Sequence, residues 1–292
     1  MEVAIAPGTY VVAVSGGVDS MVLLDVMAHL EGLKLVVAHF DHGIRLDSEE
    51  DRALVRAAAE HYGLPFVFDE GHLGPKASEA AARSSRYRFL RAVRRATSAD
   101  AILTAHHEDD VIETAIINMM RGTNRRGLAS LHAYSDVVRP LLGYTKPNIL
   151  AYAKEHRIKW REDTTNQDTR YLRNYVRHNI LAKLSDDERT ELLKHINNMA
   201  KLNTDIERDL INHLHMHPTS GQLDRHWFIM LPHNVAREVL ASWLRSFGVI
   251  NFDSKLLEKL IIGAKTLQPG KRMDVDKEHR IVINKGNLAL SA

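Results

Sequence analysis

The sequence has 292 residues, of which 45% are hydrophobic and 26% charged, so we expect a soluble globular protein with a main domain and one or two smaller units. It contains no cysteine, which excludes disulfides, thiolate metal sites, iron–sulfur clusters and cysteine nucleophiles and is typical of a reducing cytosol. The N-terminus lacks a basic region, and no apolar run approaches the roughly 18–20 residues that cross a bilayer. We therefore expect a cytoplasmic protein without membrane contact.

The formal net charge of +2 is unevenly distributed along the chain. Residues 1–120 carry 11 Lys and Arg against 18 Asp and Glu, whereas residues 121–183 carry 13 against 5. Residues 218–292 carry 11 against 7. A basic middle and tail favour a polyanion such as nucleic acid as a partner, with basic solvated helix faces as the alternative.

The first 120 residues alternate short apolar runs with longer helical patterns. The expected strands are Tyr10–Val14, Leu35–Phe40, Pro65–Phe68 and Ala101–Ala105. The expected helices lie near residues 20–30, 49–62, 78–96 and 109–120. This alternation predicts parallel βαβ units with helices on both faces of the sheet. Ligands of such sheets bind beyond the carboxyl ends of the strands.

The pattern loosens after residue 121. Arg139–Leu142 is predicted to be a final strand or extended stretch, and Thr145, with Pro147 in the first turn, to open a helix that ends near residue 156. Residues 157–171 are polar and are predicted to form a loop.

The remainder of the chain divides into a long helix and a small unit. Ser185 and Glu188 form a capping box that starts a polar helix reaching toward residue 214. The small unit is expected to hold two helices, the first with an apolar stripe, and strands at Met273–Val275, Arg280–Ile283 and Leu288–Leu290. The expected stripe consists of Val235, Val239, Trp243, Leu244 and Phe247. We therefore expect a catalytic domain at 1–183, a helical linker at 184–217 and a small substrate-binding domain at 218–292.

The stretch SGGVDS, Ser15–Ser20, lies between the first expected strand and the first expected helix. Backbone amides at such a turn point with the helix dipole at the occupant of the turn, which favours an anion. The sequence has neither the Walker pattern G-x-x-x-x-G-K-[ST] nor the dinucleotide pattern G-x-G-x-x-G. Because the turn has no P-loop lysine, we expect Mg²⁺ to neutralise the phosphates, with Asp19 as its nearest ligand.

The pattern S-G-G-x-D-S after a first strand resembles the PP-loop of the N-type ATP pyrophosphatases. The resemblance implies that ATP is split between its α and β phosphates and that a carbonyl oxygen is activated as its adenylate. The fold it implies is a parallel-sheet, Rossmann-like α/β domain, here followed by a helical linker and a small α+β C-terminal domain. The expected ATP-binding residues are Ser15, Gly16, Gly17, Val18, Asp19, Ser20 and His39.

An ordered series of further motifs over about residues 10–181 resembles the tRNA(Ile)-lysidine synthetase family. The motifs are Ala38–Arg45, the helical set Glu79, Arg83, Arg86 and Tyr87, Thr104–Asp110 with Glu113, Arg121–Leu128, Arg139–Leu142, Asp163–Asp168 and Arg173-Asn174. Residues 218–292 are more loosely similar to the substrate-binding C-terminal domain of that family. The resemblance implies that ATP activates the wobble cytidine of isoleucine tRNA with a CAU anticodon, and that L-lysine then attacks its carbon-2.

The expected roles follow from the charges that this chemistry creates. Arg83 and Arg86 would neutralise the α-phosphate during adenylation. The lysine ε-ammonium has a pKa near 10.4, so its attack needs carboxylates that hold it and accept its proton, for which Asp110 and Glu113 are the candidates. His106 could orient the amine or share the proton. The expected tRNA-phosphate contacts are Arg121, Arg125, Arg126, Arg173 and Arg177.

Several alternatives stay open from the sequence. An ammonia-dependent NAD synthetase would use the same glycine turn but would not need the basic segment. A metal-dependent phosphoesterase would use the residues from His106 to Asp110 and Asp41–Gly43 as metal ligands, and a non-catalytic RNA-binding module would leave the turn unexplained. Histidines 213, 215 and 217 resemble metal ligands without nearby carboxylates. The oligomeric state is open, and a homodimer is one option.

Overall fold

A computed structural model describes residues 1–43, 48–72, 74, 78–123, 125–132, 136–162, 172–213, 216–217, 221–249 and 252–291. The chain divides into two compact units, residues 1–200 and 201–292. The predicted motif at Asp163–Asp168 lies outside the described residues, as do Ile44, Arg45 and the side chain of Glu79. The division into a catalytic domain, linker and tail domain stays a prediction.

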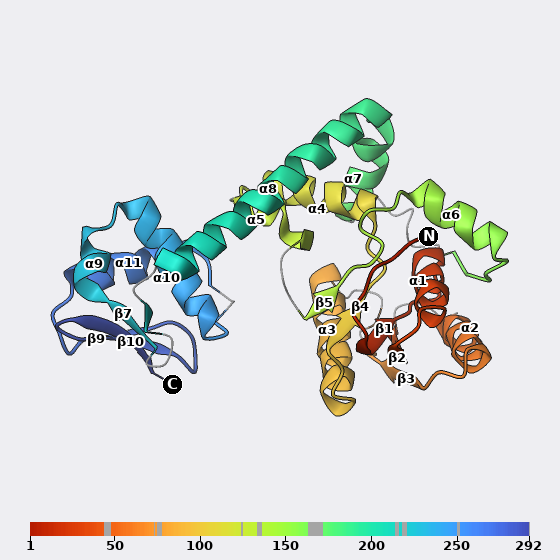
Figure 1. Ribbon diagram of the computed structural model, residues 1–292, viewed down its shortest axis with the longest axis horizontal. Helices are drawn as coiled ribbons and strands as arrows, with labels where there is room; N and C mark the ends of the chain where they lie inside the picture. Colours follow the sequence, from red (N-terminus) through yellow and green to blue (C-terminus); the bar gives the residue numbers. More distant parts are fainter. Residues whose placement is uncertain are drawn as a thin grey trace. The chain divides into compact units, whose positions relative to one another are not determined.

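The first unit is built on a five-stranded sheet in the order β3-β2-β1-β4-β5 (Figure 1). The strands are β1 (Gly8–Ala13), β2 (Leu33–Asp41), β3 (Phe66–Glu70), β4 (Ala101–Leu103) and β5 (Val137–Val138). Every neighbouring pair is parallel, and Ala13 at the end of β1 stands opposite Ala38 of β2. The predicted parallel α/β class is therefore confirmed, and the strands end together on the side where ligands are expected.

Helices cover both faces of this sheet, as alternating strand residues require (Figure 1). The helices are α1 (Val18–Ala28), α2 (Ser48–His61) and α3 (Glu79–Ala96). Val12 of β1 packs in the core shared with α1 and α2, which includes Leu24 and Val55. Its neighbour Val11 packs on the other face, against Leu90 of α3.

The predicted final strand at Arg139–Leu142 is wrong, because the strand is Val137–Val138 and the following residues turn. Pro140 has no N–H to donate to a sheet ladder. The Arg139 guanidinium instead donates to the carbonyls of Leu131 and Val137, and the amide of Leu142 donates to the carbonyl of Arg139. Backbone and side-chain bonds within this segment thus replace strand pairing.

The rest of the first unit is helical. It comprises α4 (Glu108–Met120), α5 (Arg125–Leu128), α6 (Lys146–Glu155), α7 (Leu172–Asn179), the start of α8 (Asp186–His213) and the 3-10 turns Ser130–His132 and Leu181–Lys183. Ile112 of α4, Val176 of α7 and Ile196 of α8 share one buried cluster. The predicted capping box is confirmed, because Ser185 Oγ accepts from the amide of Glu188 and the Glu188 carboxylate accepts from the amide of Ser185.

The described residues of the second unit form an antiparallel sheet in the order β6-β7-β10-β9-β8, three helices and the end of α8 (Figure 1). Its elements are β6 (Met216–His217), β7 (Gln222–Asp224), α9 (Arg225–Met230), α10 (His233–Ser246), α11 (Ser254–Thr266), β8 (Arg272–Asp274), β9 (Arg280–Ile283) and β10 (Asn287–Ser291). The predicted α+β character is confirmed. Of the predicted stripe on α10, Val239, Trp243 and Leu244 are buried, but Val235 and Phe247 are 43% and 40% exposed.

Two further expectations concern a metal site at the histidines near the end of α8 and the lack of a membrane-spanning segment. The side chains of the three histidines at 213, 215 and 217 lie outside the described residues, so the question of a metal site there stays open. Within the described part of the chain, no helix combines the length and apolar character that a membrane crossing requires.

Candidate active site

The glycine-rich turn joins β1 to α1 and is shaped by its own serines. Ser20 Oγ accepts from the amide of Ser15 at 3.1 Å and donates to the carbonyl of Gly17 at 2.9 Å. Gly16 has a φ of +95°, a conformation that glycine adopts without strain. Gly17 is the N-cap of α1 and offers no side chain to cap the first amides of that helix. The turn therefore presents backbone donors and serine hydroxyls, as an anion site requires.

Residues distant in sequence support this turn from behind. A Cβ on Gly16 would come within 3.3 Å of the Cβ of Asp51, on α2. Asp51 pairs with Arg161, whose backbone amide donates to the carbonyl of Gly16 at 3.0 Å. No local pattern in the sequence pointed to Asp51 or Arg161, because neither belongs to a recognisable motif.

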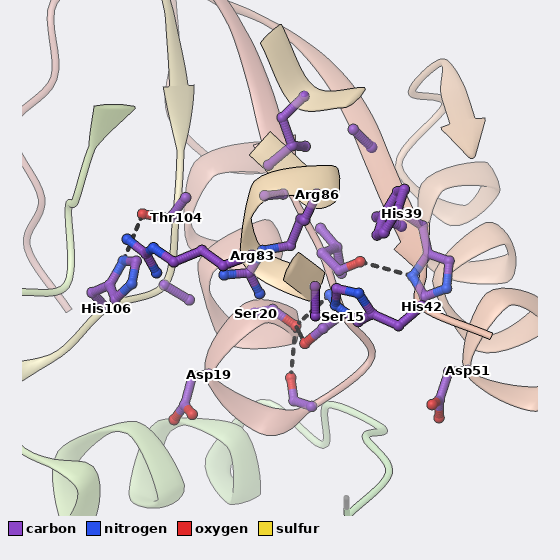
Figure 2. A pocket seen from close by; sticks show the side chains of 18 of the residues that line it. Ser15, Asp19, Ser20, His39, His42, Asp51, Arg83, Arg86, Thr104 and His106 are labelled. Carbon is purple, nitrogen blue, oxygen red and sulfur yellow. Dashed lines mark hydrogen bonds between the residues drawn. The ribbon is translucent and has the colours of Figure 1, made fainter. Parts of the chain in front are cut away.

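A pocket of about 460 Å³ opens at the carboxyl ends of β1, β2 and β4. Side chains from the turn, the strands and α3 surround it (Figure 2). The predicted residues that line it are Ser15, Gly17, Asp19, Ser20, His39, Arg83, Arg86, His106, Asp110 and Arg173. The predicted ATP-binding turn, both α3 arginines and one of the two candidate carboxylates therefore meet in one cavity.

Of the two histidines of the prediction, His39 is buried and His106 is partly buried, and both make hydrogen bonds. His39 Nδ1 lies 2.9 Å from the carbonyl oxygen of Val14, so this ring nitrogen carries the hydrogen, and burial lowers the pKa of His39. His106 Nδ1 lies 2.8 Å from Thr104 Oγ1 (Figure 2). Burial lowers the pKa of His106 to about 3, against the opposing effect of Asp110. Both rings are therefore neutral near pH 7.

Asp110 is placed by the first turn of α4. Its Oδ2 accepts from the backbone amide of His107 at 2.9 Å, and His107 Nε2 lies 3.7 Å from the same oxygen. Burial opposes the ionisation of Asp110, but His107, through its ring and its backbone amide, holds the pKa of Asp110 below the ordinary value. Asp110 is therefore an ionised carboxylate that both caps a helix and faces the pocket.

Glu113 lies one turn further along α4 and is fully buried. Burial raises its pKa, while Arg177 acts in the opposite direction. Arg177 Nε lies 2.5 Å from Glu113 Oε1, and Arg173 Nε lies 3.8 Å from its Oε2. Both arginines also reach Asp110, at 3.7 Å and 4.0 Å. The two carboxylates thus form one site with two guanidinium groups from α7.

A lysine reaches the glycine turn from outside the motif. Lys146 Nζ, from the first residue of α6, lies 2.5 Å from Asp19 Oδ1. His107 Nε2 lies 3.9 Å from the other oxygen of Asp19. Neither Lys146 nor His107 was among the predicted site residues. The sequence separation of 127 between Lys146 and Asp19 explains why spacing along the chain could not reveal this pair.

The fit of Mg²⁺ to this donor set can be tested on the same geometry. The described residues contain no group of three or more His, Cys, Asp or Glu side chains arranged to hold a metal ion. Mg²⁺ usually needs only one or two carboxylates, with substrate phosphates and water completing its shell. Asp19 and Asp110 both line the pocket and both approach His107. The residues therefore suit a magnesium ion that arrives with a nucleotide.

The remaining predicted arginines lie at the other end of α4. Arg121 is the exposed C-cap of α4, and Arg125 and Arg126 belong to α5, which is tied to α4 by a bond from Asn118 Nδ2 to the carbonyl of Gly127. At 1.5 Å per residue, about 16 Å of helix separates Arg121 from Asp110. These three arginines therefore lie apart from the pocket, unlike Arg173, which lines it, and Arg177, which pairs with Asp110 of its lining.

Residues 5–184 match the family described as "PP-loop domain". Curated relatives named tRNA(Ile)-lysidine synthase are 38% identical over 177 residues in Solibacter usitatus and 44% identical over 182 residues in Thermus thermophilus. Both matches cover 60% of this chain, and they cover 40% and 36% of the relatives. A relative of the same name from Francisella tularensis subsp. holarctica is 27% identical over 98% of this chain and 74% of its own length.

A similar solved structure is that of the U34-tRNA thiolase NcsA from Methanococcus maripaludis, with a TM-score of 0.54 and 15% sequence identity. The similarity covers 68% of this chain and 74% of the thiolase and shows the fold alone. The chain spans less than half the length of the Solibacter and Thermus relatives that it matches.

Proposed function

Because the chain belongs to the PP-loop domain family, we propose that it uses ATP to join L-lysine to carbon-2 of the wobble cytidine of isoleucine tRNA with a CAU anticodon. The products would be lysidine in the tRNA, AMP and pyrophosphate. The names of the curated relatives support this substrate assignment. The observation that carries the proposal is the single pocket in which the glycine turn, two arginines and an ionised carboxylate meet.

In the first step the cytidine carbonyl oxygen attacks the α-phosphorus and pyrophosphate leaves. The amides of Val18 and Asp19 and the hydroxyl of Ser15 would bind the phosphates, while Mg²⁺ held by Asp19 would supply further positive charge. Arg83 and Arg86 reach the same cavity from α3 (Figure 2). Fixed positive groups around a phosphate in a partly enclosed pocket stabilise the charge that develops during in-line displacement.

In the second step the lysine ε-amine attacks carbon-2 and AMP leaves. The carboxylates of Asp110 and Glu113 already hold two guanidinium groups, so the site is suited to a cation. A substrate ammonium would occupy part of this space and lose its proton to one of the carboxylates. Neutral His106, beside Asp110, would orient the amine rather than carry a charge.

The tRNA would approach across the basic segment of the chain. Single-stranded loops expose their bases readily, so the wobble cytidine can leave the anticodon stack and enter the pocket. Arg121, about 16 Å along α4 from Asp110, and Arg125 and Arg126 of the adjoining α5 would contact phosphates of the anticodon arm. Arg173 and Arg177 would do so once substrate lysine has taken their place at the carboxylates.

Labelled lysine and an unmodified isoleucine tRNA transcript with a CAU anticodon test the proposal. We expect ATP-dependent incorporation of lysine that survives mild alkali, because the product holds a C–N bond and no ester. Lysine-independent hydrolysis of a phosphoester with Mn²⁺ and without ATP would support the phosphoesterase alternative. Consumption of ammonia with an adenylated dinucleotide would support NAD synthetase. Either result would overturn the assignment.

Two variants separate the steps. Glu113→Gln removes one candidate base and should lower lysine incorporation about 100-fold or more, while tRNA-dependent ATP–pyrophosphate exchange stays within about twofold. Asp109→Asn is the matched control, because Asp109 is the neighbour of Asp110 but pairs with Arg189 at 2.8 Å and does not line the pocket. Equal loss of both reactions in Glu113→Gln would contradict the assigned role.

A further inference from the structure

Lys146 contacts the glycine-rich turn from a helix that the motif does not include. Its Nζ lies 2.5 Å from Asp19 Oδ1, and the two side chains are 34% and 30% exposed. Asp19 lines the pocket. The ammonium group is therefore at the border of the phosphate site and accessible from it.

The backbone of Lys146 is fixed, so that only its side chain can move. Thr145 caps α6 by accepting from the amide of Asn148, and the carbonyl of Tyr144 accepts from the amide of Glu108 at 3.0 Å. Tyr152 OH donates to Asp25 Oδ2 of α1 at 2.8 Å. The Tyr144 bond holds the start of α6 beside the start of α4, and the Tyr152 bond holds the later part of α6 beside the later part of α1.

A lysine on a rigid backbone can change partners without a rearrangement of the fold. The first turn of α1 already carries one negative charge, at Asp19, and a nucleotide triphosphate would add about four more. A lysine ammonium is a compact point charge on a flexible stem and is well suited to phosphate. Mg²⁺ would compete with Lys146 for Asp19, and the displaced ammonium would lie next to the phosphates.

We propose that Lys146 is a phosphate-binding residue, which leaves Asp19 when magnesium–ATP enters and then holds the β and γ phosphates that depart as pyrophosphate. The assignment rests on the proposed use of ATP. It supplies, from α6, the lysine that the glycine turn itself lacks. Pyrophosphate and ATP should therefore depend on Lys146, whereas AMP should not.

A purely structural role predicts the opposite effect. If Lys146 only neutralised Asp19, its removal would free that carboxylate for Mg²⁺, and ATP would bind equally well or more tightly. If Lys146 binds phosphate, its removal weakens the binding of ATP and of pyrophosphate by about 10-fold or more, which is the effect expected for the loss of one charged hydrogen bond.

Calorimetric titrations of the whole chain with magnesium–ATP, pyrophosphate and AMP test this difference. Lys146→Met should weaken the binding of magnesium–ATP and of pyrophosphate about 10-fold and change the dissociation constant of AMP by no more than about twofold. Lys154→Met, the same change in the last turn of α6, should leave all three constants as in the parent protein. Unchanged or tighter ATP binding in Lys146→Met would overturn the proposal.

The absence of cysteine allows a direct chemical rescue. K146C can be alkylated at a single thiol with bromoethylamine, which rebuilds an ammonium of lysine length, or with iodoacetamide, which adds a neutral amide. Bromoethylamine should restore ATP and pyrophosphate affinity, and iodoacetamide should not. Equal affinity of the two adducts would refute the role of the charge. Binding is measured without tRNA, so the two proposals are tested separately. A negative result for Lys146 would not contradict lysine transfer, and a negative result for lysine transfer would not contradict phosphate binding by Lys146.

Discussion

Arg177 of α7 contacts Glu113 of α4, with Nε 2.5 Å from Oε1. Glu113 is fully buried, and burial raises its pKa, while the guanidinium favours its ionised form. The pair therefore allows a charged carboxylate to remain inside the first unit. It also ties the helix that follows residue 171 to the helix that carries the candidate catalytic carboxylates.

Removal of this guanidinium should destabilise the protein in a pH-dependent way. In Arg177→Met the buried carboxylate of Glu113 loses its paired guanidinium, which should lower the free energy of unfolding by about 1–3 kcal/mol near pH 7.5. The pKa of Glu113 already lies above its ordinary value of 4.5, so stability falls as pH rises from 4.5 through the folded pKa. Arg177→Met raises that pKa further, so its deficit should shrink toward pH 4.5, where Glu113 is more fully protonated in both proteins.

Urea unfolding at pH 4.5 and 7.5 measures this effect. The double variant Glu113→Gln with Arg177→Met should recover much of the loss at pH 7.5, because no buried charge remains. A deficit of equal size at both pH values would show that Arg177 acts through packing alone.

The two glycines of the turn should respond differently to alanine. Gly16 has a φ of +95°, and its Cβ would approach Asp51, so Gly16→Ala should cost about 1–2 kcal/mol of stability. Gly17 has a φ of −74°, and its Cβ would meet only Ser15 Oγ, at 3.7 Å. Gly17→Ala should therefore unfold like the parent protein yet bind ATP less tightly. Thermal unfolding and ATP titration check both, and normal ATP binding by Gly17→Ala would argue against close approach of phosphate.

Charge reversal at the far end of α4 should affect tRNA alone. Arg125→Glu with Arg126→Glu should weaken tRNA binding at least 10-fold and reduce its salt dependence, with ATP affinity unchanged. The matched control reverses two exposed arginines of α3, Arg88 and Arg95. Filter binding at several salt concentrations provides the measurement. Unchanged tRNA affinity would place the anticodon arm elsewhere.

His106 should remain neutral through the functional pH range. Burial lowers its pKa to about 3, so its ring signals in NMR should not titrate between pH 8 and 5. The signals that are missing from the spectrum of His106→Gln identify this ring. Below about pH 6.5 the unfolded chain binds a proton at His106 that the folded chain does not bind. Between pH 7 and 5 the free energy of unfolding of the parent protein should therefore fall by roughly 1–2 kcal/mol more than that of His106→Gln. A midpoint near 6 in the ring signals would contradict the burial argument.

Periodicity predicted the parallel sheet and its helices because both depend on local apolar spacing. The first four strands follow from such spacing, the capping box follows from Ser185 and Glu188 three residues apart, and both predictions are confirmed. The strand expected at Arg139–Leu142 failed because an apolar run next to Pro140 is also compatible with a turn. The local sequence does not reveal that the Arg139 side chain donates hydrogen bonds to the carbonyls of Leu131 and Val137.

The sequence by itself determined the glycine-rich turn, since strand, glycines and helix are adjacent in the chain and their dihedral preferences are local. It also identified the residues that line the pocket from β2, α3 and α4, through motifs at the strand ends. Only the tertiary structure decided which charges face one another. Lys146 meets Asp19, and Arg177 meets Glu113, across 127 and 64 residues. Such pairs arise from the packing of helices onto a common sheet, and no spacing rule along the chain encodes them.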